Sequence, residues 1–313
     1  MKRRDFLKYS AMTAGAISLA PSCMSSNSKK QSDDIGPDLE STTLENPVPM
    51  KKSIMWGTVS LKNLSFADAC RIVKAAGYDG IEPGSHMDRA EVIDGMAAVG
   101  LTASSVCNSQ HWNLLLSSPD ASVRSEGIKA QIRAMEDAKA YGTDSVLLVP
   151  GRVDADTSYR DCWKRSTECI KELVPAAEEM KVNICIENVW NNFLLSSVEA
   201  RMYVEQFSSE RVGWYFDCGN ILNLGWPEQW IEILGAHIKR VHIKEFDKTL
   251  ADKEGRWKGF SVKLADGEVN WKAVMAGLRK YYAGGWLTTE QGPASTPEEI
   301  ADLASRLDGI MKL

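Results

Sequence analysis

The stretch from residue 182 to residue 220, VNICIENVWNNFLLSSVEARMYVEQFSSERVGWYFDCGN, decides the fold class. It contains two short runs rich in Val, Ile and aromatic residues, Val182–Glu187 and Val212–Asp217, which predict buried strands. Between them, Ser197–Phe207 has a helical pattern, and Ser197 suits an N-cap. A strand, a helix and a second strand in this order predict parallel strands joined by a right-handed crossover.

The same unit repeats from residue 53 to residue 313. Further strands are expected at Ser53–Val59, Gly80–Glu82, Leu101–Cys107, Ser145–Pro150, Arg240–Ile243 and Gly285–Glu290. Further helices are expected at Ser65–Ala76, Asp88–Val99, Pro119–Tyr141, Tyr159–Met180, Pro227–Leu234, Trp271–Tyr282 and Pro297–Leu313. Eight strand–helix units in about 260 residues predict a single-domain α/β fold, the (β/α)8 TIM barrel. The alternative, a doubly wound sheet, usually has fewer units, and the turn at Ser60–Leu64 lacks the glycines of a dinucleotide site.

The N-terminal residues have a different character. Residues 2–8, Lys-Arg-Arg-Asp-Phe-Leu-Lys, resemble a twin-arginine export signal, and a weakly apolar stretch follows. We therefore expect a signal peptide at residues 1–23, a flexible linker at residues 24–52, and an exported, periplasmic protein. Cys23 is either a lipidated cysteine, which would anchor the protein to a membrane, or a bystander thiol.

Composition excludes several classes of protein. Charged residues make up 25% of the chain and apolar residues 44%, which is ordinary for a globular protein. The net charge of −5 and the lack of a basic run after residue 52 argue against a nucleic-acid partner. No apolar stretch is long enough for a transmembrane helix. The cysteines other than Cys23 are scattered, and we expect them to be buried thiols rather than disulfides.

Polar residues end four successive predicted strands. They are Glu187, Asp217, His242 and Glu290. The carboxyl ends of barrel strands meet at one rim, so we expect these side chains to converge there. Three neighbouring carboxylates would raise one another's pKa unless a divalent cation compensated their charge. Oxygen donors with one imidazole favour Mn²⁺, Mg²⁺ or Co²⁺ over Zn²⁺.

The same motifs carry a resemblance to a known family. Ile-Glu-Asn at 186–188, Phe-Asp-Cys-Gly-Asn at 216–220, His-Ile-Lys-Glu at 242–245 and the final Glu290 resemble the xylose isomerase-like TIM-barrel superfamily. Within it, the chain is similar to the sugar phosphate isomerase/epimerase group that includes D-tagatose 3-epimerase. The resemblance covers about residues 53–313.

This resemblance implies a metal-dependent isomerase or epimerase with a small carbohydrate substrate. It assigns Glu187, Asp217, His242 and Glu290 as metal ligands. It also makes Glu187 and Glu290 the catalytic pair, in which one carboxylate takes a proton from the carbon next to a carbonyl and the other returns one to the opposite face. The metal would stabilise the enediolate. Asn220 stands where related epimerases often have His, and an amide cannot transfer protons.

Other residues near the strand ends are candidates for contact with the sugar. Trp112 suits stacking on a sugar ring, and Lys244 suits either a substrate oxygen or the balance of the site's negative charge. Trp190 and Trp226 follow strand ends and are candidates for lining the pocket. The expected substrate-binding set is Glu82, His111, Trp112, Asn220 and Lys244.

Alternative functions remain open at this point. A lyase or hydrolase of 3-keto glycosides would use the same metal and glutamates, and a non-catalytic sugar-binding lipoprotein would use the same fold. An apurinic-site endonuclease would need about five histidines for its zinc ions, whereas the chain has 4. Because an exported enzyme meets few sugar phosphates, we expect a neutral, unphosphorylated keto sugar or keto glycoside. The loop at Gln291–Thr296, where a phosphate site is expected, has no nearby Arg.

Overall fold

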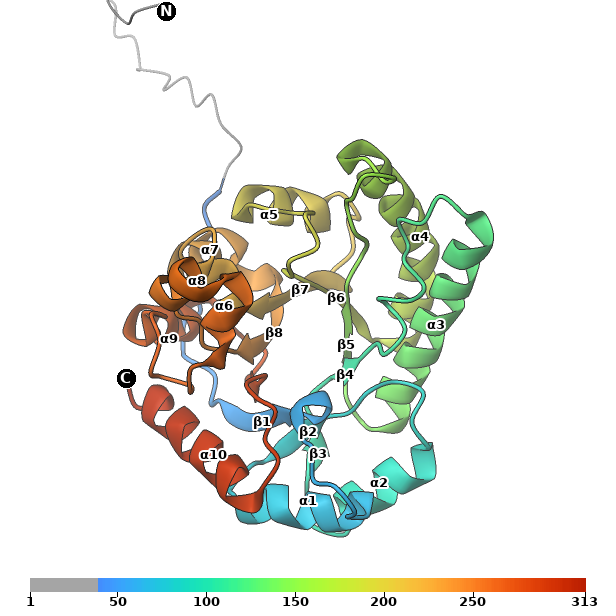
Figure 1. Cartoon of the computed structure of the whole chain (residues 1–313). Coiled ribbons are helices and arrows are strands. Elements are labelled where there is room, and N and C mark those ends of the chain that lie inside the picture. The colour runs from blue at the N-terminus through green and yellow to red at the C-terminus, as the bar shows by residue number, and fades with distance from the viewer. Residues whose placement is uncertain (1–38) are drawn as a thin grey trace, which may run out of the picture. The chain divides into compact units, whose positions relative to one another are not determined.

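Nine short strands form one parallel sheet that curves into a barrel, with helices packed around its outside (Figure 1). The computed structural model describes residues 39–313, so the predicted signal peptide and Cys23 lie outside the described residues. The sheet order is β3-β2-β1-β9-β8-β7-β6-β5-β4. The strands are β1 (Lys51–Met55), β2 (Gly80–Glu82), β3 (Thr102–Ala103), β4 (Val106–Cys107), β5 (Ser145–Leu148), β6 (Asn183–Glu187), β7 (Val212–Asp217), β8 (Ile238–Ile243) and β9 (Trp286–Thr289).

The third expected strand is split in two. Its first half, β3, pairs with β2, and its second half, β4, pairs with β5. Between the halves lie Ser104 and Ser105, which are fully buried. Ser105 Oγ donates a hydrogen bond to Glu82 Oε1 at 2.8 Å. Because β3 and β4 together make up the third expected strand, the nine observed strands correspond to the eight strands of the predicted (β/α)8 barrel.

The helices follow the predicted pattern closely. They are α1 (Phe66–Ala75), α2 (Arg89–Ala97), α3 (Ala121–Ala140), α4 (Tyr159–Met180), α5 (Ser197–Glu205), α6 (Cys218–Leu222), α7 (Pro227–Leu234), α8 (Lys248–Glu254), α9 (Trp271–Tyr281) and α10 (Pro297–Met311), with 3₁₀ turns η1 (Trp56–Thr58), η2 (Gly235–His237) and η3 (Arg256–Ser261). Helix α5 begins at a capping box in which Ser196 and Glu199 bond each other's backbone N–H. Sequence patterns did not predict the short helices α6 and α8, which lie in loops at the carboxyl end of the barrel.

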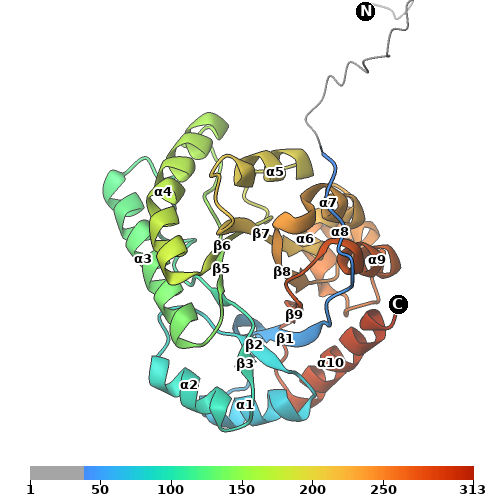
Figure 2. The same cartoon turned by 180° about the vertical axis from the view of Figure 1, so that it is seen from behind.

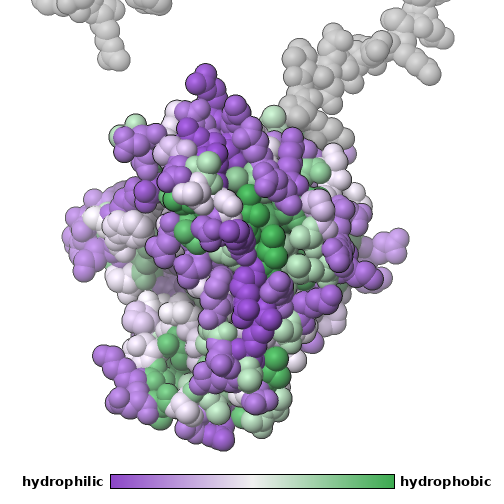
Figure 3. Space-filling view, turned by 90° about the vertical axis from the view of Figure 1, so that its right-hand side faces the viewer, coloured by the Kyte–Doolittle hydropathy of each residue, from purple (hydrophilic) through white to green (hydrophobic). Residues whose placement is uncertain are grey.

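Two apolar cores hold the barrel together. The larger lies between the sheet and the helices, and the smaller fills the barrel interior around Leu147, Val149, Cys185 and Tyr215. The cysteines of the described residues are free thiols, as expected, and most of them are buried. The surface in Figure 3 is mostly hydrophilic, with apolar residues in small separate groups. No helix within residues 39–313 has the length and apolarity required to cross a membrane.

The chain joins the barrel earlier than the predicted linker boundary. Strand β1 begins at Lys51, whereas the sequence placed the start of the domain at residue 53. Before it, Leu44 N donates to Lys280 O at 2.8 Å in α9, and Ser41 Oγ donates to Ile233 O at 3.2 Å in α7. Figure 2 shows this segment running past α7 and α9 to β1. Ser41 and Leu44, both within the predicted linker, therefore have bonded partners on the barrel.

Candidate metal and sugar site

Four side chains converge at the carboxyl ends of β6 to β9. Glu187 ends β6, Asp217 ends β7, His242 lies in β8 and Glu290 directly follows β9. One ligand atom from each lies within 4.8 Å of the others. The register explains this convergence, because Asp217 is paired directly with His242, and Glu290 N donates to the carbonyl of Ile243. The structure thus brings together all four residues that the sequence proposed as metal ligands.

A cavity of about 330 Å³ opens above this cluster. Glu187 and Glu290 line it, and their side chains are 7% and 20% exposed. Asp217 and His242 are fully buried below it. Two of the three carboxylates therefore face the space in which a small molecule would bind.

His242 is held from behind by Glu82. Its Nε2 lies 2.7 Å from Glu82 Oε2, and its Nδ1 lies 3.1 Å from Glu187 Oε1 and 2.9 Å from Glu290 Oε2. Glu82, expected to contact substrate, is not among the residues that line the cavity, and its carboxylate is fully buried between His242 and Ser105. A carboxylate behind an imidazole fixes the ring orientation and leaves the other ring nitrogen free to bind a metal.

Lys244 supplies positive charge to the cluster. Its Nζ lies 2.9 Å from Glu290 Oε2 and 3.4 Å from Asp217 Oδ2. Both oxygens are buried, and their contacts among the described residues are ion pairs with Lys244 and, for Glu290, with His242. Buried carboxylate oxygens together with one imidazole nitrogen form a donor set that fits a hard divalent cation.

The electrostatics of the cluster reflect burial and crowding. Burial raises the pKa of Asp217 to about 7, and the carboxylates of Glu187 and Glu290 add to this rise. Burial also raises the pKa of Glu187. Burial would raise the pKa of Glu290 as well, but the charges of Lys244 and His242 outweigh it and hold that pKa below its ordinary value.

His111 and Trp112 reach the cavity from the loop after β4. Trp112 is 45% exposed, and its ring lies edge-on to that of His111 with centroids 5.7 Å apart. His111 Nδ1 accepts the backbone N–H of Val149 at 3.3 Å, and burial lowers its pKa to about 4. The ring is therefore neutral near pH 7, and a neutral imidazole offers one donor and one acceptor nitrogen.

Asn220 and Trp190 also line the cavity. Asn220 Nδ2 donates to Asn188 O at 3.0 Å, and Trp190 Nε1 donates to Asn220 O at 2.9 Å. Trp226, also expected at the pocket, is not among its lining residues and is 60% exposed. The two differ in position along the chain: Trp226 is the N-cap residue of α7, whereas Trp190 lies in the loop that follows β6.

Sequence reasoning missed two aromatic residues of the cavity, Trp257 and Phe260 in η3. Both rings lie 4.8 Å from the ring of Trp190. Lys244 Nζ lies 5.2 Å from the Phe260 ring centroid. The length of the segment between β8 and α9 could have indicated them, because long loops after barrel strands commonly contribute residues to the active site.

Glu245 anchors that segment. Its carboxylate, fully buried, accepts N–H groups from Phe246 at 3.1 Å, Ala265 at 2.9 Å, Val269 at 3.0 Å and the Trp271 ring at 2.7 Å. The side chain of Gln291 accepts from Glu245 N at 2.7 Å and donates to Phe260 O and Val262 O at 3.0 and 2.8 Å. These bonds fix the position of η3 over the cavity.

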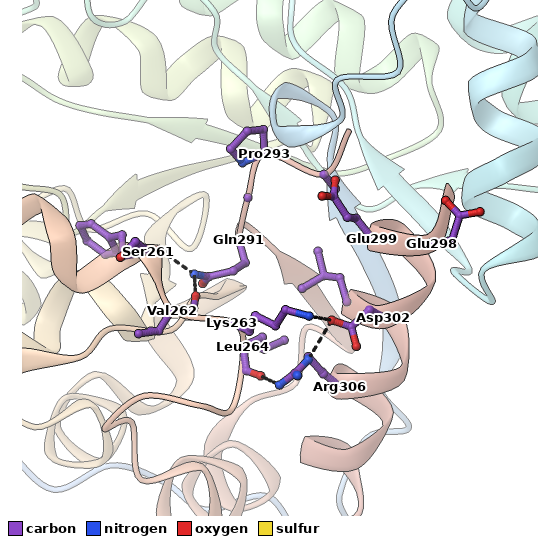
Figure 4. Close-up of a pocket in the computed structure, with 14 residues that line it drawn as sticks. Ser261, Val262, Lys263, Leu264, Gln291, Pro293, Glu298, Glu299, Asp302 and Arg306 are labelled. Atoms are coloured by element: carbon purple, nitrogen blue, oxygen red, sulfur yellow. Dashed lines mark hydrogen bonds and ion pairs between the residues drawn. The ribbon is translucent and has the colours of Figure 1, made fainter. Parts of the chain in front are cut away.

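A larger cavity, about 670 Å³, lies beside the site between the loop after β8 and α10 (Figure 4). Its basic side chains pair with acidic partners: Lys263 with Asp302 at 3.0 Å, and Arg306 with Asp302 at 3.0 Å and Asp266 at 2.9 Å. It contains none of the converging ligands. We therefore place the chemistry in the smaller cavity, which shares Phe260 with the larger one.

Comparisons with known proteins agree with this architecture. L-ribulose-5-phosphate 3-epimerase UlaE of Salmonella paratyphi C (strain RKS4594) is 24% identical over 254 residues, covering 74% of this chain and 86% of that protein. The structure of D-psicose 3-epimerase from Clostridium cellulolyticum H10 has a TM-score of 0.70 at 15% identity and covers 84% of this chain and 99% of its own. 3-Keto-D-glucoside 4-epimerase YcjR from E. coli has a TM-score of 0.68 at 15% identity, covering 84% of this chain and 100% of its own.

The family match spans most of the barrel. Residues 70–308 match the family described as xylose isomerase-like TIM barrel. This range contains all four converging side chains and every strand from β2 to β9. The chain therefore belongs to the xylose isomerase-like TIM barrel family.

Proposed function

We propose that this protein is a divalent-metal-dependent epimerase or isomerase of a keto sugar, which acts by proton transfer at the carbon next to a carbonyl. One observation carries the proposal: Glu187 and Glu290 are the cluster carboxylates that line the cavity, and they come from β6 and β9, on either side of β7 and β8. The relative and the two structural neighbours described above are named as sugar epimerases, which supports the same reaction class.

The two glutamates supply the proton chemistry. One carboxylate takes a proton from the carbon next to the carbonyl, which leaves an enediolate. The other glutamate, in its acid form, delivers a proton to the opposite face of that carbon, so the configuration inverts and the charge balances. Their origin on different strands, β6 and β9, suits these two separate roles.

The donor set assigns the metal to specific residues. Glu187, Asp217, His242 Nδ1 and Glu290 would hold it, and Mn²⁺, Mg²⁺ and Co²⁺ suit these ligands. When bound, the cation supplies Lewis-acid stabilisation of negative charge on the substrate oxygens. Glu82 fixes the orientation of His242, and Lys244 balances part of the carboxylate charge.

The remaining cavity residues bind and orient the sugar. His111 offers its neutral imidazole, and Asn220 offers its amide, to hydroxyl groups of the sugar. Trp112 offers an aromatic face for the apolar side of a sugar ring. These three residues carry no net charge at neutral pH, and the cationic lining residue, Lys244, is already paired with Glu290 and Asp217, which suits a neutral, unphosphorylated substrate.

Deuterium exchange tests the proposal. Full-length protein loaded with Mn²⁺ is incubated in D₂O with paired free and phosphorylated ketoses and with 3-keto glucosides. Deuterium next to the carbonyl, with any glycosidic bond intact, is the expected result. Release of the aglycone would identify a lyase or hydrolase instead, and the absence of exchange with every substrate would leave a sugar-binding protein. Turnover confined to phosphorylated ketoses would contradict the neutral substrate.

A further inference from the structure

Trp257 is an exposed aromatic residue held in a defined position at the cavity. It is 68% exposed, yet it lines the same cavity as Glu187 and Glu290. Its ring lies 4.8 Å from that of Trp190, inclined by 48°. The guanidinium of Arg256 lies over both rings, 5.3 Å from the Trp257 centroid and 4.4 Å from that of Trp190. Its neighbours therefore restrict the ring although most of it faces solvent.

The backbone that carries Trp257 is fixed to the barrel. Gln291 binds the carbonyls of Phe260 and Val262 just after it. Gly259 allows close packing on the fully buried Phe246, since a Cβ there would lie 2.3 Å from Phe246 Cε2. A rigid backbone beneath an exposed tryptophan preorganises a flat apolar surface for a ligand.

A second exposed tryptophan faces the cavity from another part of the ring. Trp112 follows β4, and Trp257 follows β8. In the sheet order, β5, β6 and β7 separate these strands on one side, and β9, β1, β2 and β3 separate them on the other. The two tryptophans thus come from loops after well-separated strands and line the same cavity as Glu187 and Glu290.

We infer that the mouth is a second binding subsite, in which Trp257, supported by Trp190, stacks on a ring joined by a glycosidic bond to the keto sugar at the floor. The substrate class is then a keto glycoside rather than a free ketose. Sugar rings and aromatic aglycones present flat faces with apolar C–H or π surface, which stack on indole. A volume of about 330 Å³ lies at the lower end of the range of roughly 300–1,000 Å³ that is typical of small-molecule pockets. The identity of the inner ring rests on the proposed function.

Binding of unreactive ligands tests the subsite without catalysis. Mn²⁺-loaded full-length protein is titrated by calorimetry with methyl β-D-glucoside, which has one ring, and with phenyl β-D-glucoside, which has two. The expected result is about tenfold tighter binding of the phenyl glucoside. Trp257→Ala should remove this preference and leave methyl glucoside binding unchanged, while Trp257→Phe should keep most of the preference.

Trp226→Ala is the matched control, because Trp226 is similarly exposed but lies outside the cavity. It should leave binding of both ligands unchanged. The inference is overturned if wild-type protein shows no preference, if neither ligand binds at millimolar concentration, or if Trp257→Ala and Trp226→Ala behave alike. If the preference holds but no substrate exchanges deuterium, the subsite stands and the proposed function fails. If free ketoses exchange deuterium and the preference for the phenyl glucoside is absent, the proposed function stands and the subsite fails.

Discussion

At the scale of single residues, some side chains of the site line the cavity and others lie behind them and hold them in position. Glu187 and Glu290 line the cavity, whereas Asp217 and His242 lie beneath it. Glu82 lies behind His242 and has no contact with the cavity. Residues of the same chemical type therefore have different expected effects when they are replaced.

Replacing either cavity glutamate tests the acid–base pair. Glu187→Gln and Glu290→Gln should each lower the exchange rate about 10²- to 10⁴-fold, because an amide neither accepts nor donates the transferred proton. NMR of the product in D₂O measures this rate. Glu126→Gln, at an exposed ion pair with Lys129, is the control and should have no effect. Retention of the full rate by either cavity variant would remove that glutamate from the mechanism.

Glu82 is expected to act through His242. Glu82→Gln should weaken Mn²⁺ binding about 10- to 100-fold, because the imidazole loses the carboxylate that orients it and raises its basicity. Calorimetric titration of metal into the metal-free protein gives the dissociation constant. A dissociation constant equal to that of wild-type protein, with a normal melting temperature, would show that Glu82 has no influence on the ligand.

His111 predicts how stability depends on pH. Its pKa is about 4 in the folded protein and 6.5 ordinarily, so between these values the unfolded state binds a proton that the folded state does not. The free energy of unfolding should therefore fall as the pH drops from 6.5 to 4, by about 3 kcal/mol from this group. Urea unfolding of wild-type protein and His111→Gln across this range measures the difference. Parallel curves would contradict the prediction.

At the scale of elements, the segment between β8 and α9 contributes the aromatic wall of the cavity. The four donors to Glu245 come from positions spread over residues 246–271, so one buried carboxylate organises the whole segment. Loss of an acceptor oxygen of Glu245 would leave buried N–H groups without a hydrogen-bond partner, which lowers the stability of the segment.

Replacing Glu245 should loosen this segment. In Glu245→Gln an amide NH₂ replaces one acceptor oxygen, and we expect a loss of about 1–3 kcal/mol in local stability. Hydrogen exchange at residues 246–271 should become faster, while exchange in α3 stays unchanged. Glu268→Gln, at an exposed acid of the same segment that accepts from Thr249, should have a much smaller effect. Equal exchange in the two variants would show that Glu245 does not organise the segment.

At the scale of the whole molecule, the closed parallel sheet accounts for the position of the site. Closure brings the carboxyl ends of distant strands to one rim, and the helices cover the outer face of the sheet (Figure 1). The N-terminal residues were interpreted from sequence alone, and we propose from them that the folded barrel is exported by the twin-arginine route.

The export proposal has a direct test. Replacing Arg3 and Arg4 by Lys keeps the charge but removes the paired guanidinium groups, so the precursor should remain in the cytoplasm. Cell fractionation with immunodetection measures this. The matched control replaces Lys2 and Lys8 by Arg, and export should persist. If both double variants fractionate like the wild type, the twin-arginine assignment is wrong.

Sequence patterns alone predicted the barrel and the four residues that converge. Strands in a (β/α)8 fold all run in one direction, so a residue at a strand's carboxyl end is assigned to the rim without knowledge of its neighbours. That is why Glu187, Asp217, His242 and Glu290 were found from their positions in the chain. The split of the third strand was not predictable, because it depends on which neighbouring strand each half pairs with.

Only the tertiary structure decided which side chains support the site and which line it. Glu82 and His242 are 160 residues apart, and nothing local distinguishes a carboxylate that contacts substrate from one that orients a histidine. Trp257 lies in a segment without strand or helix periodicity, and its place beside Trp190 depends on the buried bonds of Glu245 and Gln291. Backbone periodicity is a local property of the sequence, whereas side-chain partners depend on how the closed barrel packs.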